Sequence, residues 1–372
     1  MRFNGSTADT IGIEYELQLL DGNSLDMTDA ILPLLGRMSE GHAHIEPEYV
    51  QSTVEVVSRT MEDCHALESH LRERVGFIRG KCHELGLEIC GGGTHPFRTR
   101  LGKVTPEPRY YDVEAETGYA GAIQMVCATH VHIGVPSGDE AVWLMRRLRP
   151  YLPVLLGLSA ASPFYMGVDS GFAAYRPRVL LAAHSYGTPP PLHSWPEFES
   201  IWSAARRANV YRTFKDMHWD IRPKPEFGTV EVRIMDGQRT VHATVAIAAL
   251  VHSLSRYLQR KGRRRACLQE LPYWAEVENA YRAAHQGLDA HLIVNERGDT
   301  RLLTDIATDM LKTIEPTARA LGETAWLEGS IAEMVKGGAS YLRQREVFAR
   351  TGSLREVVAD AVRELSEELT RH

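Results

Sequence analysis

The feature of this sequence that most constrains its fold is a set of short segments in which hydrophobic and polar residues alternate. Four segments show the pattern: GIEYELQLL at Gly12–Leu20, QSTVEVV at Gln51–Val57, THVHIGV at Thr129–Val135 and GTVEVRI at Gly228–Ile234. Strict alternation is typical of β-strands, because successive side chains point to opposite faces of a sheet. The sequence therefore predicts strands with one hydrophobic face and one polar face.

The polar faces of these predicted strands carry residue types that are unusual for a surface in contact with solvent. They hold Glu14, Glu16, Gln18, Gln51, Thr53, Glu55, His130, His132, Thr229, Glu231 and Arg233. One such strand alone would be interpreted as a half-exposed strand of an antiparallel sheet. Solvated faces also collect lysine and serine, however, so four strands rich in glutamate and histidine favour a shared face that carries chemistry.

Carboxylates crowded on one face of a sheet repel one another unless cations lie among them. Glutamate oxygens together with imidazole nitrogens suit Mg²⁺ or Mn²⁺, and Mg²⁺ keeps coordination positions for water and phosphate oxygens. Arg233 lies beside Glu231 on the last strand and has the planar group that binds a phosphoryl group at two points. The face is therefore typical of a phosphoryl-transfer site that holds metal ions and nucleotide phosphates.

The rest of the chain predicts an α+β fold, with strands first and helices last, and no linker divides residues 1–372 into separate domains. Strands are predicted at residues 10–20, 48–58, 87–91, 124–135, 218–222 and 229–235. Helices are predicted at residues 28–38, 61–85, 140–158, 195–208, 240–259, 302–321 and 354–369, and the pattern after residue 240 is almost wholly helical. Residues 162–194 are rich in proline, glycine and serine and predict loops.

Charge and hydropathy exclude several classes of protein. The net charge of −6 argues against nucleic-acid binding, and the one basic cluster, RKGRRR at Arg260–Arg265, is interpreted as a solvated loop. The hydrophobic stretch Tyr151–Val168 is interrupted by prolines, and Thr244–Leu258 is too short to span a membrane. We therefore expect no nucleic-acid partner and no membrane association.

The cysteines and the first residues predict a protein of the reducing cytosol. The five cysteines form no CxxC pair, so their spacing predicts neither a disulfide framework nor a structural zinc site. The opening residues, MRFNGSTADT, lack the hydrophobic region of a signal peptide. We expect a cytoplasmic location.

Two further segments contain residue types that contact ligands in many proteins, and each also has a simpler interpretation. The glycine-rich GGGTHPF at Gly91–Phe97 is either a turn after a strand or a close approach to substrate through Thr94 and His95. HAHIEPE at His42–Glu48 is interpreted as a surface loop with incidental histidines. The sequence has no GxxxxGK[ST] loop, no kinase signature and no HExxH motif.

With these segments in this order, the sequence resembles the bacterial carboxylate–amine ligases, also called the glutamate–cysteine ligase type 2 family. The resemblance implies a glutamine-synthetase-like fold, in which an antiparallel sheet with flanking helices and a helical C-terminal part forms a saddle around Mg²⁺ and ATP. The matching stretches are GIEYELQLLD at Gly12–Asp21, QSTVEVVS at Gln51–Ser58, GGGTHPF, THVHIGV, SPFYMGVDSG at Ser162–Gly171 and HWDIRPKPEFGTVEVRIMD at His218–Asp236.

The resemblance also assigns roles to residues of this sequence. Arg233 and Glu55 are implied to act in catalysis, Arg233 as a phosphate contact. The sequence departs from the family pattern at Tyr175, which precedes Arg176 where many members have a small residue. This departure affects the expected shape of the substrate pocket. The implied metal ligands, for Mg²⁺ or Mn²⁺, are Glu14, Glu16, Glu55, His130 and Glu231. The implied substrate- or nucleotide-binding residues are Thr94, His95, His132, Arg176 and Arg222.

The sequence thus predicts an ATP-dependent carboxylate–amine ligase with weak glutamate–cysteine ligase activity, which forms an acyl phosphate and releases ADP and phosphate. Its substrates would be ATP, a glutamate-like carboxylate and an amine such as cysteine, and the resemblance implies a homodimer. Two alternatives stay open. One is a phosphotransferase on the same fold that stops at the phosphorylated product, and the other is a nucleotide- or metal-binding protein without turnover.

Overall fold

The structure, a computed structural model, describes residues 1–7, 10–38, 43–261 and 268–371. Its centre is a seven-stranded sheet with the order β10-β11-β5-β1-β3-β2, and β4 pairs with the last residues of β1. Every pair in this sheet is antiparallel, so the predicted α+β fold with an antiparallel sheet is confirmed. The strands are β1 (Ile11–Asp21), β2 (Ile45–Pro47), β3 (Thr53–Val57), β4 (Leu87–Cys90), β5 (Thr129–Gly134), β10 (Ile221–Lys224) and β11 (Thr229–Val232).

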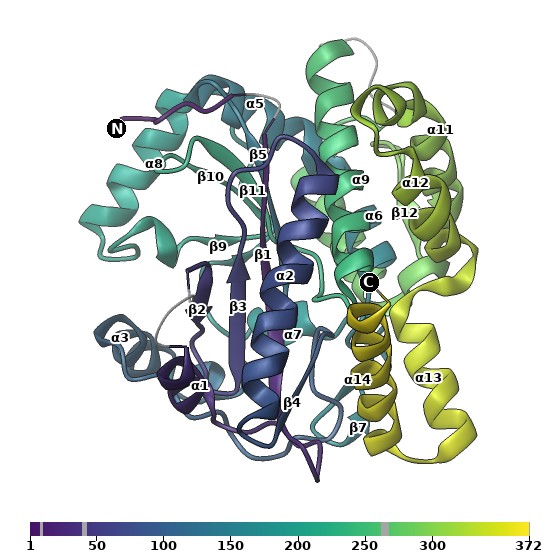
Figure 1. Ribbon diagram of the computed structural model, residues 1–372. Coiled ribbons are helices and arrows are strands. Elements are labelled where there is room, and N and C mark those ends of the chain that lie inside the picture. The colour runs from purple at the N-terminus through teal and green to yellow at the C-terminus, as the bar shows by residue number, and fades with distance from the viewer. Residues whose placement is uncertain (8–9, 39–42, 262–267, 372) are drawn as a thin grey trace.

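The hydrophobic face of the sheet packs against two long helices, α2 (Cys64–His83) and α9 (Val241–Lys261). Both lie on the same side of β1 and β3 in Figure 1. On β1, the alternate residues Ile13, Tyr15 and Leu17 point to this side and are buried. Hydrophobic residues therefore alternate along the strands because these helices bury one face of the sheet.

Helix α2 shows how the sequence sets its own boundaries and its buried side. Asp63 precedes the helix, and its carboxylate accepts a hydrogen bond from the amide of Ala66, which satisfies one free donor of the first turn. The buried residues recur every three or four positions, as in Leu67, Leu71 and Val75. This spacing gives the helix one hydrophobic side, which faces the sheet.

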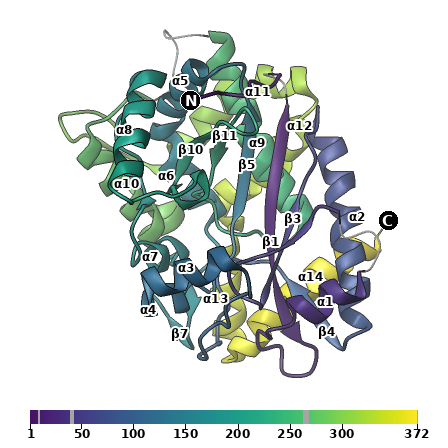
Figure 2. The same cartoon turned by 90° about the vertical axis from the view of Figure 1, so that its left-hand side faces the viewer.

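The other, polar face of the sheet is bordered by short elements and loops. Figure 2 is turned toward this side and shows α3 and α7 at the lower end of β5 and β1. The predicted loops at 162–194 do contain mostly irregular chain, with short elements between. The elements within this segment are β6 (Phe164–Tyr165), β7 (Val168–Asp169), α7 (Arg176–Leu180) and β8 (Tyr186–Gly187). The other short elements are α3 (Pro108–Thr117), α4 (Tyr119–Ala122), η2 (Phe214–Asp216) and β9 (His218–Trp219).

Three predictions of elements need correction. The single helix predicted at 140–158 is three elements, because Pro150 and Pro153 lack the amide that an uninterrupted helix would need. Helix α3 was not predicted, since none of its residues is buried and it therefore has no hydrophobic periodicity. The segment HAHIEPE is not only a loop, because its last residues form β2 at the sheet edge, while His42 lies outside the described residues. The three elements are α5 (Gly138–Leu148), η1 (Arg149–Tyr151) and α6 (Leu152–Ser159).

The C-terminal part is mainly helical, and α11 packs against α9 on the side away from the sheet. A short hairpin interrupts the helices, and the almost wholly helical pattern of the sequence after residue 240 did not predict it. Its turn contains Gly298, whose φ of +84° lies in the left-handed region that favours glycine. The C-terminal elements are α10 (Tyr273–Gln286), η4 (Gly287–Asp289), β12 (His291–Ile293), β13 (Thr300–Leu302), α11 (Leu303–Leu321), α12 (Thr324–Trp326), η5 (Leu327–Ile331), η6 (Met334–Gly338), α13 (Ser340–Thr351) and α14 (Leu354–Thr370). Helix α8 (Trp195–Arg207) lies earlier in the chain and packs against α5.

Two further sequence predictions concern the basic cluster and membrane-spanning helices. The basic cluster at 260–265 lies almost entirely outside the described residues. Among the helices of the described part of the chain, none combines the length and the hydropathy that crossing a membrane requires.

Candidate active site

The register of the sheet brings polar residues from separate segments into one row. Directly paired residues on antiparallel strands point to the same face, so the pairs fix the side on which each residue lies. The pairs are Arg222 with Glu231, Glu231 with His132, His130 with Glu14, and Glu16 with Glu55. These residues therefore share the face that points away from α2 and α9. Glu46 pairs with Glu55, and Glu48, Lys224 and Arg233 each lie two residues from a member of this set, so all of them belong to the same face. We call the whole set the polar row.

The polar row is not a solvated surface. Glu16 and Glu55 are each 7 % exposed, His130 is 5 % exposed, and Glu231 is 0 % exposed. Burying a carboxylate is costly unless it has charged or hydrogen-bonding partners. The interpretation of these strands as half-exposed is therefore wrong, and the partners of each carboxylate become informative.

Glu14 occupies the middle of the row between the two histidines. Its Oε2 lies 2.8 Å from Nδ1 of His130, and its Oε1 lies 3.2 Å from Nε2 of His132. Burial and Glu231 act to raise the pKa of Glu14, but the hydrogen bonds from both histidines outweigh them and hold it well below its usual value. Burial lowers the pKa of His130 to about 4, so this imidazole is neutral at pH 7, the form that binds metals.

On the β1 and β3 side of the row, three carboxylates lie close together. Burial, followed by repulsion from Glu48, raises the pKa of Glu16 to about 8. Burial and repulsion from Glu14 raise the pKa of Glu55 well above its usual value. No arginine or lysine among the described residues forms an ion pair with Glu16, Glu48 or Glu55, and we call these three the anionic half of the site.

On the β10 and β11 side, the charges have the opposite balance. The guanidinium of Arg222 donates to both oxygens of Glu231, over 2.7 and 3.1 Å. Arg233 donates to Oε1 of Glu231, and Nζ of Lys224 lies 3.7 Å from Oε2. Burial acts to raise the pKa of Glu231, but Arg222 and Arg233 outweigh it and hold the pKa well below its usual value. We call these four residues the cationic half.

Two overlapping groups of side chains have the geometry to hold a metal ion, and both include His130. One is Glu16, Glu55 and His130, and the other is Glu14, His130 and Glu231. Within each group the ligand atoms lie within 4.8 Å of one another. Carboxylate oxygens with one imidazole fit Mg²⁺ or Mn²⁺. The first group fits better, because the oxygens of Glu231 are already engaged by cationic side chains.

A cavity of about 390 Å³ opens beside the cationic half, next to His130 and Arg233. Asp220 also lines it, and the far wall consists of Tyr273 and Tyr281 from α10. The amide of Arg233 donates to the carbonyl of Asp220, which fixes the two residues on adjacent chain segments. A substrate in this cavity would therefore meet a guanidinium and a carboxylate close together.

A second cavity of about 250 Å³ lies beyond the rings of Tyr186 and His218, which line both cavities. The two rings are stacked with centroids 4.5 Å apart and an angle of 10° between their planes. Arg109 and Arg212 line the second cavity. Two cavities that share one aromatic wall therefore lie beside one another at the site.

Several residues that the sequence assigned to substrate binding have other contacts. The hydroxyl of Thr94 donates to the carbonyl of Phe164, and Nε2 of His95 lies 2.9 Å from the carbonyl oxygen of Leu25. Neither residue lines the two cavities beside the polar row. All three nitrogens of the Arg222 guanidinium are engaged within the protein, the third by the carbonyls of Phe214 and Met217.

Arg176 does lie at the site, where it fastens the chain that follows β11. Its Nη2 donates to the carbonyls of Arg233, Ile234 and Met235 over 2.8 to 3.0 Å, and its Nε donates to Asp236. These bonds fix the backbone that carries Arg233. Tyr175, the departure from the family pattern, packs against other aromatic rings and does not line either cavity.

Sequence reasoning missed Glu48, Tyr186, His218 and Asp220 as members of the site. Glu48 follows the short strand β2, and its alternation with Glu46 was the one signal that could have indicated it. Tyr186 and His218 come from β8 and β9, two-residue strands that pair in parallel and leave no periodicity in the sequence.

Comparison with known proteins identifies the family of this chain. Residues 10–360 match the family described as Glutamate-cysteine ligase family 2 (GCS2). A protein of Trichormus variabilis, provisionally named glutamate–cysteine ligase 2, is 40 % identical over 372 residues, which cover 99 % of this chain and 96 % of that protein. A protein of Mycolicibacterium paratuberculosis with the same provisional name is 34 % identical over 365 residues, covering 98 % and 96 %.

Solved structures share the fold at much lower identity. The glutamate–cysteine ligase of Francisella tularensis in complex with AMP has a TM-score of 0.71 and 13 % identity, over 100 % of this chain and 91 % of that chain. A bifunctional glutathione synthetase of Pasteurella multocida has a TM-score of 0.72 and 13 % identity, over 97 % of this chain and 52 % of that chain. These likenesses confirm the predicted fold, and together with the match along the sequence they establish that the chain belongs to glutamate–cysteine ligase family 2.

Proposed function

We propose that this ATP-dependent ligase of the glutamate–cysteine ligase type activates a glutamate-like carboxylate as an acyl phosphate, which an amine then attacks. A free carboxylate is a poor electrophile, and transfer of the γ-phosphoryl group gives it a good leaving group. The observation that carries the proposal is the division of one buried polar row into an anionic half and a cationic half beside a cavity.

The anionic half supplies the ligands for a divalent cation. Glu16 and Glu55, together with His130, would hold Mg²⁺ or Mn²⁺. The other group, Glu14, His130 and Glu231, would hold a second ion less well, because cationic side chains engage the oxygens of Glu231. Such ions, when bound, neutralise charge on the phosphate oxygens of the nucleotide. The crowding of unpaired carboxylates is the feature of this chain that supports this assignment, because it is unfavourable without a cation.

Arg233 is the group that we assign to the transferring phosphoryl group. It lines the cavity, and its Nη1 lies 3.4 Å from Nδ1 of His130, between the two halves of the row. Burial acts to lower the pKa of Arg233, but Glu231 outweighs it and raises the pKa, so the guanidinium keeps its charge. A fixed guanidinium stabilises charge that develops on phosphoryl oxygens without having to reorganise.

Arg222, Lys224 and Arg176 would then act as positioning residues. Arg222 and Lys224 hold the carboxylate of Glu231, which in turn holds Arg233, while Arg176 holds the backbone around Arg233. The amine would enter through the cavity, where Asp220 offers a carboxylate for its ammonium group. No nucleophilic side chain is needed, because the phosphorylated carboxylate is itself the activated species.

The experiment that tests the proposal measures ADP release and product formation for pairs of amino acids with ATP and Mg²⁺. We expect ADP and an amide, with glutamate as the first carboxylate and cysteine among the amines accepted. ADP with a stable phosphorylated product and no amide would instead indicate a phosphotransferase. Nucleotide binding without ADP release for any pair would indicate a binding protein without turnover. We also propose a homodimer, on the resemblance of the sequence to this family, and light scattering would test it.

A further inference from the structure

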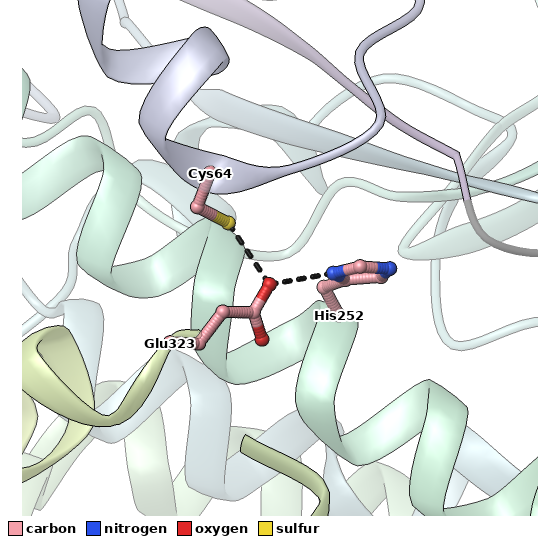
Figure 3. Close-up of side chains that lie close together, drawn as sticks. All are labelled: Cys64, His252 and Glu323. Carbon is pink, nitrogen blue, oxygen red and sulfur yellow. Dashed lines mark hydrogen bonds and ion pairs between the residues drawn. The ribbon is translucent and has the colours of Figure 1, made fainter. Parts of the chain in front are cut away.

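A second cluster of buried polar side chains lies outside the candidate active site, where α2, α9 and α12 meet. It consists of Cys64, His252 and Glu323, and we call it the Cys–His–Glu cluster (Figure 3). Cys64 is the first residue of α2, His252 lies within α9, and Glu323 immediately precedes α12. Each of the three residues is only 1 % exposed, so bulk water does not solvate their polar atoms.

The three side chains converge on one carboxylate oxygen. The thiol of Cys64 donates to Oε1 of Glu323 over 3.1 Å, and Nδ1 of His252 lies 2.6 Å from the same oxygen, as Figure 3 shows. The hydroxyl of Ser253 donates to the other oxygen, Oε2. Both carboxylate oxygens of Glu323 therefore have hydrogen-bond partners within the protein.

The charge of the cluster, in contrast, is not balanced. Among the described residues, His252 is the only partner of Glu323 that can carry a positive charge. A neutral His252 leaves a buried carboxylate with neutral partners alone, which is unfavourable in a protein interior. A protonated His252 leaves a buried Nε2–H with no acceptor in the described part of the chain. Each form without a bound cation therefore has an uncompensated group.

We propose that the Cys–His–Glu cluster binds a divalent transition-metal ion of the zinc type through Sγ of Cys64, Nδ1 of His252 and a carboxylate oxygen of Glu323. These ligand atoms lie within 4.8 Å of one another. Zinc binds thiolate, imidazole and carboxylate at about 2.0–2.3 Å, so an ion between the three atoms reaches all of them after small side-chain movements.

Proton and charge balance favour this ion. Binding replaces the thiol proton of Cys64, which leaves to solvent, and moves the proton of a neutral His252 from Nδ1 to Nε2. A dipositive ion with one thiolate, one carboxylate and one neutral imidazole has no net charge. Nε2 of His252 points away from the cluster in Figure 3 and lacks a partner with or without the ion. The gain from the ion is therefore the compensated charge of Glu323, relative to the form with a neutral His252.

This centre would be separate from the oxygen-rich site of the polar row. A thiolate ligand selects zinc-type ions over Mg²⁺, whereas the carboxylates of the polar row suit Mg²⁺. The ligands come from three segments far apart in the sequence, which is why the spacing of the cysteines gave no sign of a zinc site. The ion would join α2, which packs on the sheet, to the C-terminal helices.

The test uses the full chain, produced in medium that contains Co²⁺ and purified in excess Mg²⁺, which occupies oxygen-rich sites. We expect about one tightly held Co²⁺ per chain and a thiolate-to-cobalt charge-transfer absorption band. In parallel, protein from zinc-containing medium should hold about one Zn²⁺ per chain by mass spectrometry of the metals.

Two variants and a matched control separate the centre from general metal binding. Cys64→Ser keeps a hydroxyl that can donate to Glu323 but removes the sulfur ligand, so the absorption band should disappear. Glu323→Gln removes the charge, and its Co²⁺ content should fall at least tenfold. Cys82→Ser is the control, because Cys82 is equally buried on the same helix but has no histidine or carboxylate partner in the described chain.

The outcomes are distinct from those that test the ligase activity. Loss of the band in Cys64→Ser, with the band kept in Cys82→Ser, supports the centre even if the chain has no ligase activity. Folded wild-type protein that holds neither Co²⁺ nor Zn²⁺ overturns the proposal. A charge-transfer band that persists in Cys64→Ser also overturns it, since another thiolate would then be the ligand.

Discussion

The two halves of the polar row have the same strand geometry and opposite electrostatics. In the cationic half, one carboxylate, Glu231, lies among Arg222, Arg233 and Lys224. In the anionic half, Glu16 and Glu55 lie near Glu48, and none of these carboxylates forms an ion pair with an arginine or lysine among the described residues. Arg176 and Arg233 act to lower the pKa of Glu16, but burial and Glu48 outweigh them. The carboxylate of the cationic half is paired with cationic side chains of the protein, whereas the carboxylates of the anionic half have no such ion pairs among the described residues. This difference supports our proposal that one half binds phosphate and the other binds metal ions.

Because the halves differ in charge, replacing a glutamate by glutamine should change the stability of the folded protein in opposite directions in the two halves. A glutamate of the cationic half stabilises the folded protein, because its removal leaves three buried cations without their carboxylate. A glutamate of the anionic half destabilises the metal-free protein, because its removal relieves repulsion. The following predictions test these signs in order of expected effect.

Glu231→Gln should have the largest effect on stability. Breaking a buried ion pair by removing one partner typically costs about 3–5 kcal/mol, and here the carboxylate has several cationic partners. We expect a loss of that size in the free energy of unfolding, measured by urea denaturation. Glu46→Gln is the control, since Glu46 lies in the same row on β2 but is exposed. Equal stability of the two variants would show that the cationic half is not held by Glu231.

Arg233→Lys should lower kcat by about 10²–10³-fold, because a single ammonium group cannot replace two-point contact with the transferring phosphoryl group. The KM for ATP should change less than kcat. Arg178→Lys is the matched control, because Arg178 lines the same cavity but lies outside the polar row. If Arg233→Lys kept the wild-type kcat but lost stability, Arg233 would have only a structural role as a partner of Glu231.

The stability of the metal-free protein should depend on pH in a direction set by Glu16. Its pKa is raised to about 8 in the folded protein, so between the usual glutamate pKa and pH 8 the folded state binds a proton that the unfolded state has released. Stability contributed by this group is therefore lost as the pH rises through that window. We expect Tm without metal to fall from pH 5 toward pH 8, and saturating Mg²⁺ to reduce the slope. An equal slope with and without Mg²⁺ would contradict the assignment of Glu16 as a ligand.

The sequence predicted the faces of the sheet better than the contacts on them. Alternation placed Glu14, Glu16, Glu55 and Glu231 on polar faces, because the period of two follows directly from strand geometry. It could not tell which strands are neighbours, since register depends on how distant segments pair. The division of the row into two halves is therefore a property of the fold, and no single segment contains it.

The residues that were missed or assigned differently share one physical reason, which is that their partners lie far away in the sequence. Arg222 was assigned to a substrate carboxylate, yet its pairing with Glu231 follows from the hairpin of β10 and β11. Glu48 follows a strand of three residues, so its alternation with Glu46 is too brief to identify a strand from the sequence. His252 lies in a helix that is buried on almost all sides, so nothing in the local pattern distinguishes it from a core residue.

The most direct test of the division into halves is calorimetric titration of the metal-free protein with Mg²⁺, for wild type, Glu55→Gln and Glu46→Gln. Wild type should bind Mg²⁺ at pH 7 with release of protons, because the pKa of Glu16, raised to about 8, keeps this group largely protonated without metal. Glu55→Gln should bind Mg²⁺ at least tenfold more weakly, a typical loss for such sites being about 10–100-fold, and should be at least as stable as wild type without metal. Glu46→Gln should behave as wild type. Unchanged Mg²⁺ affinity in Glu55→Gln, or binding without proton release, would contradict the assignment of the anionic half as the metal site.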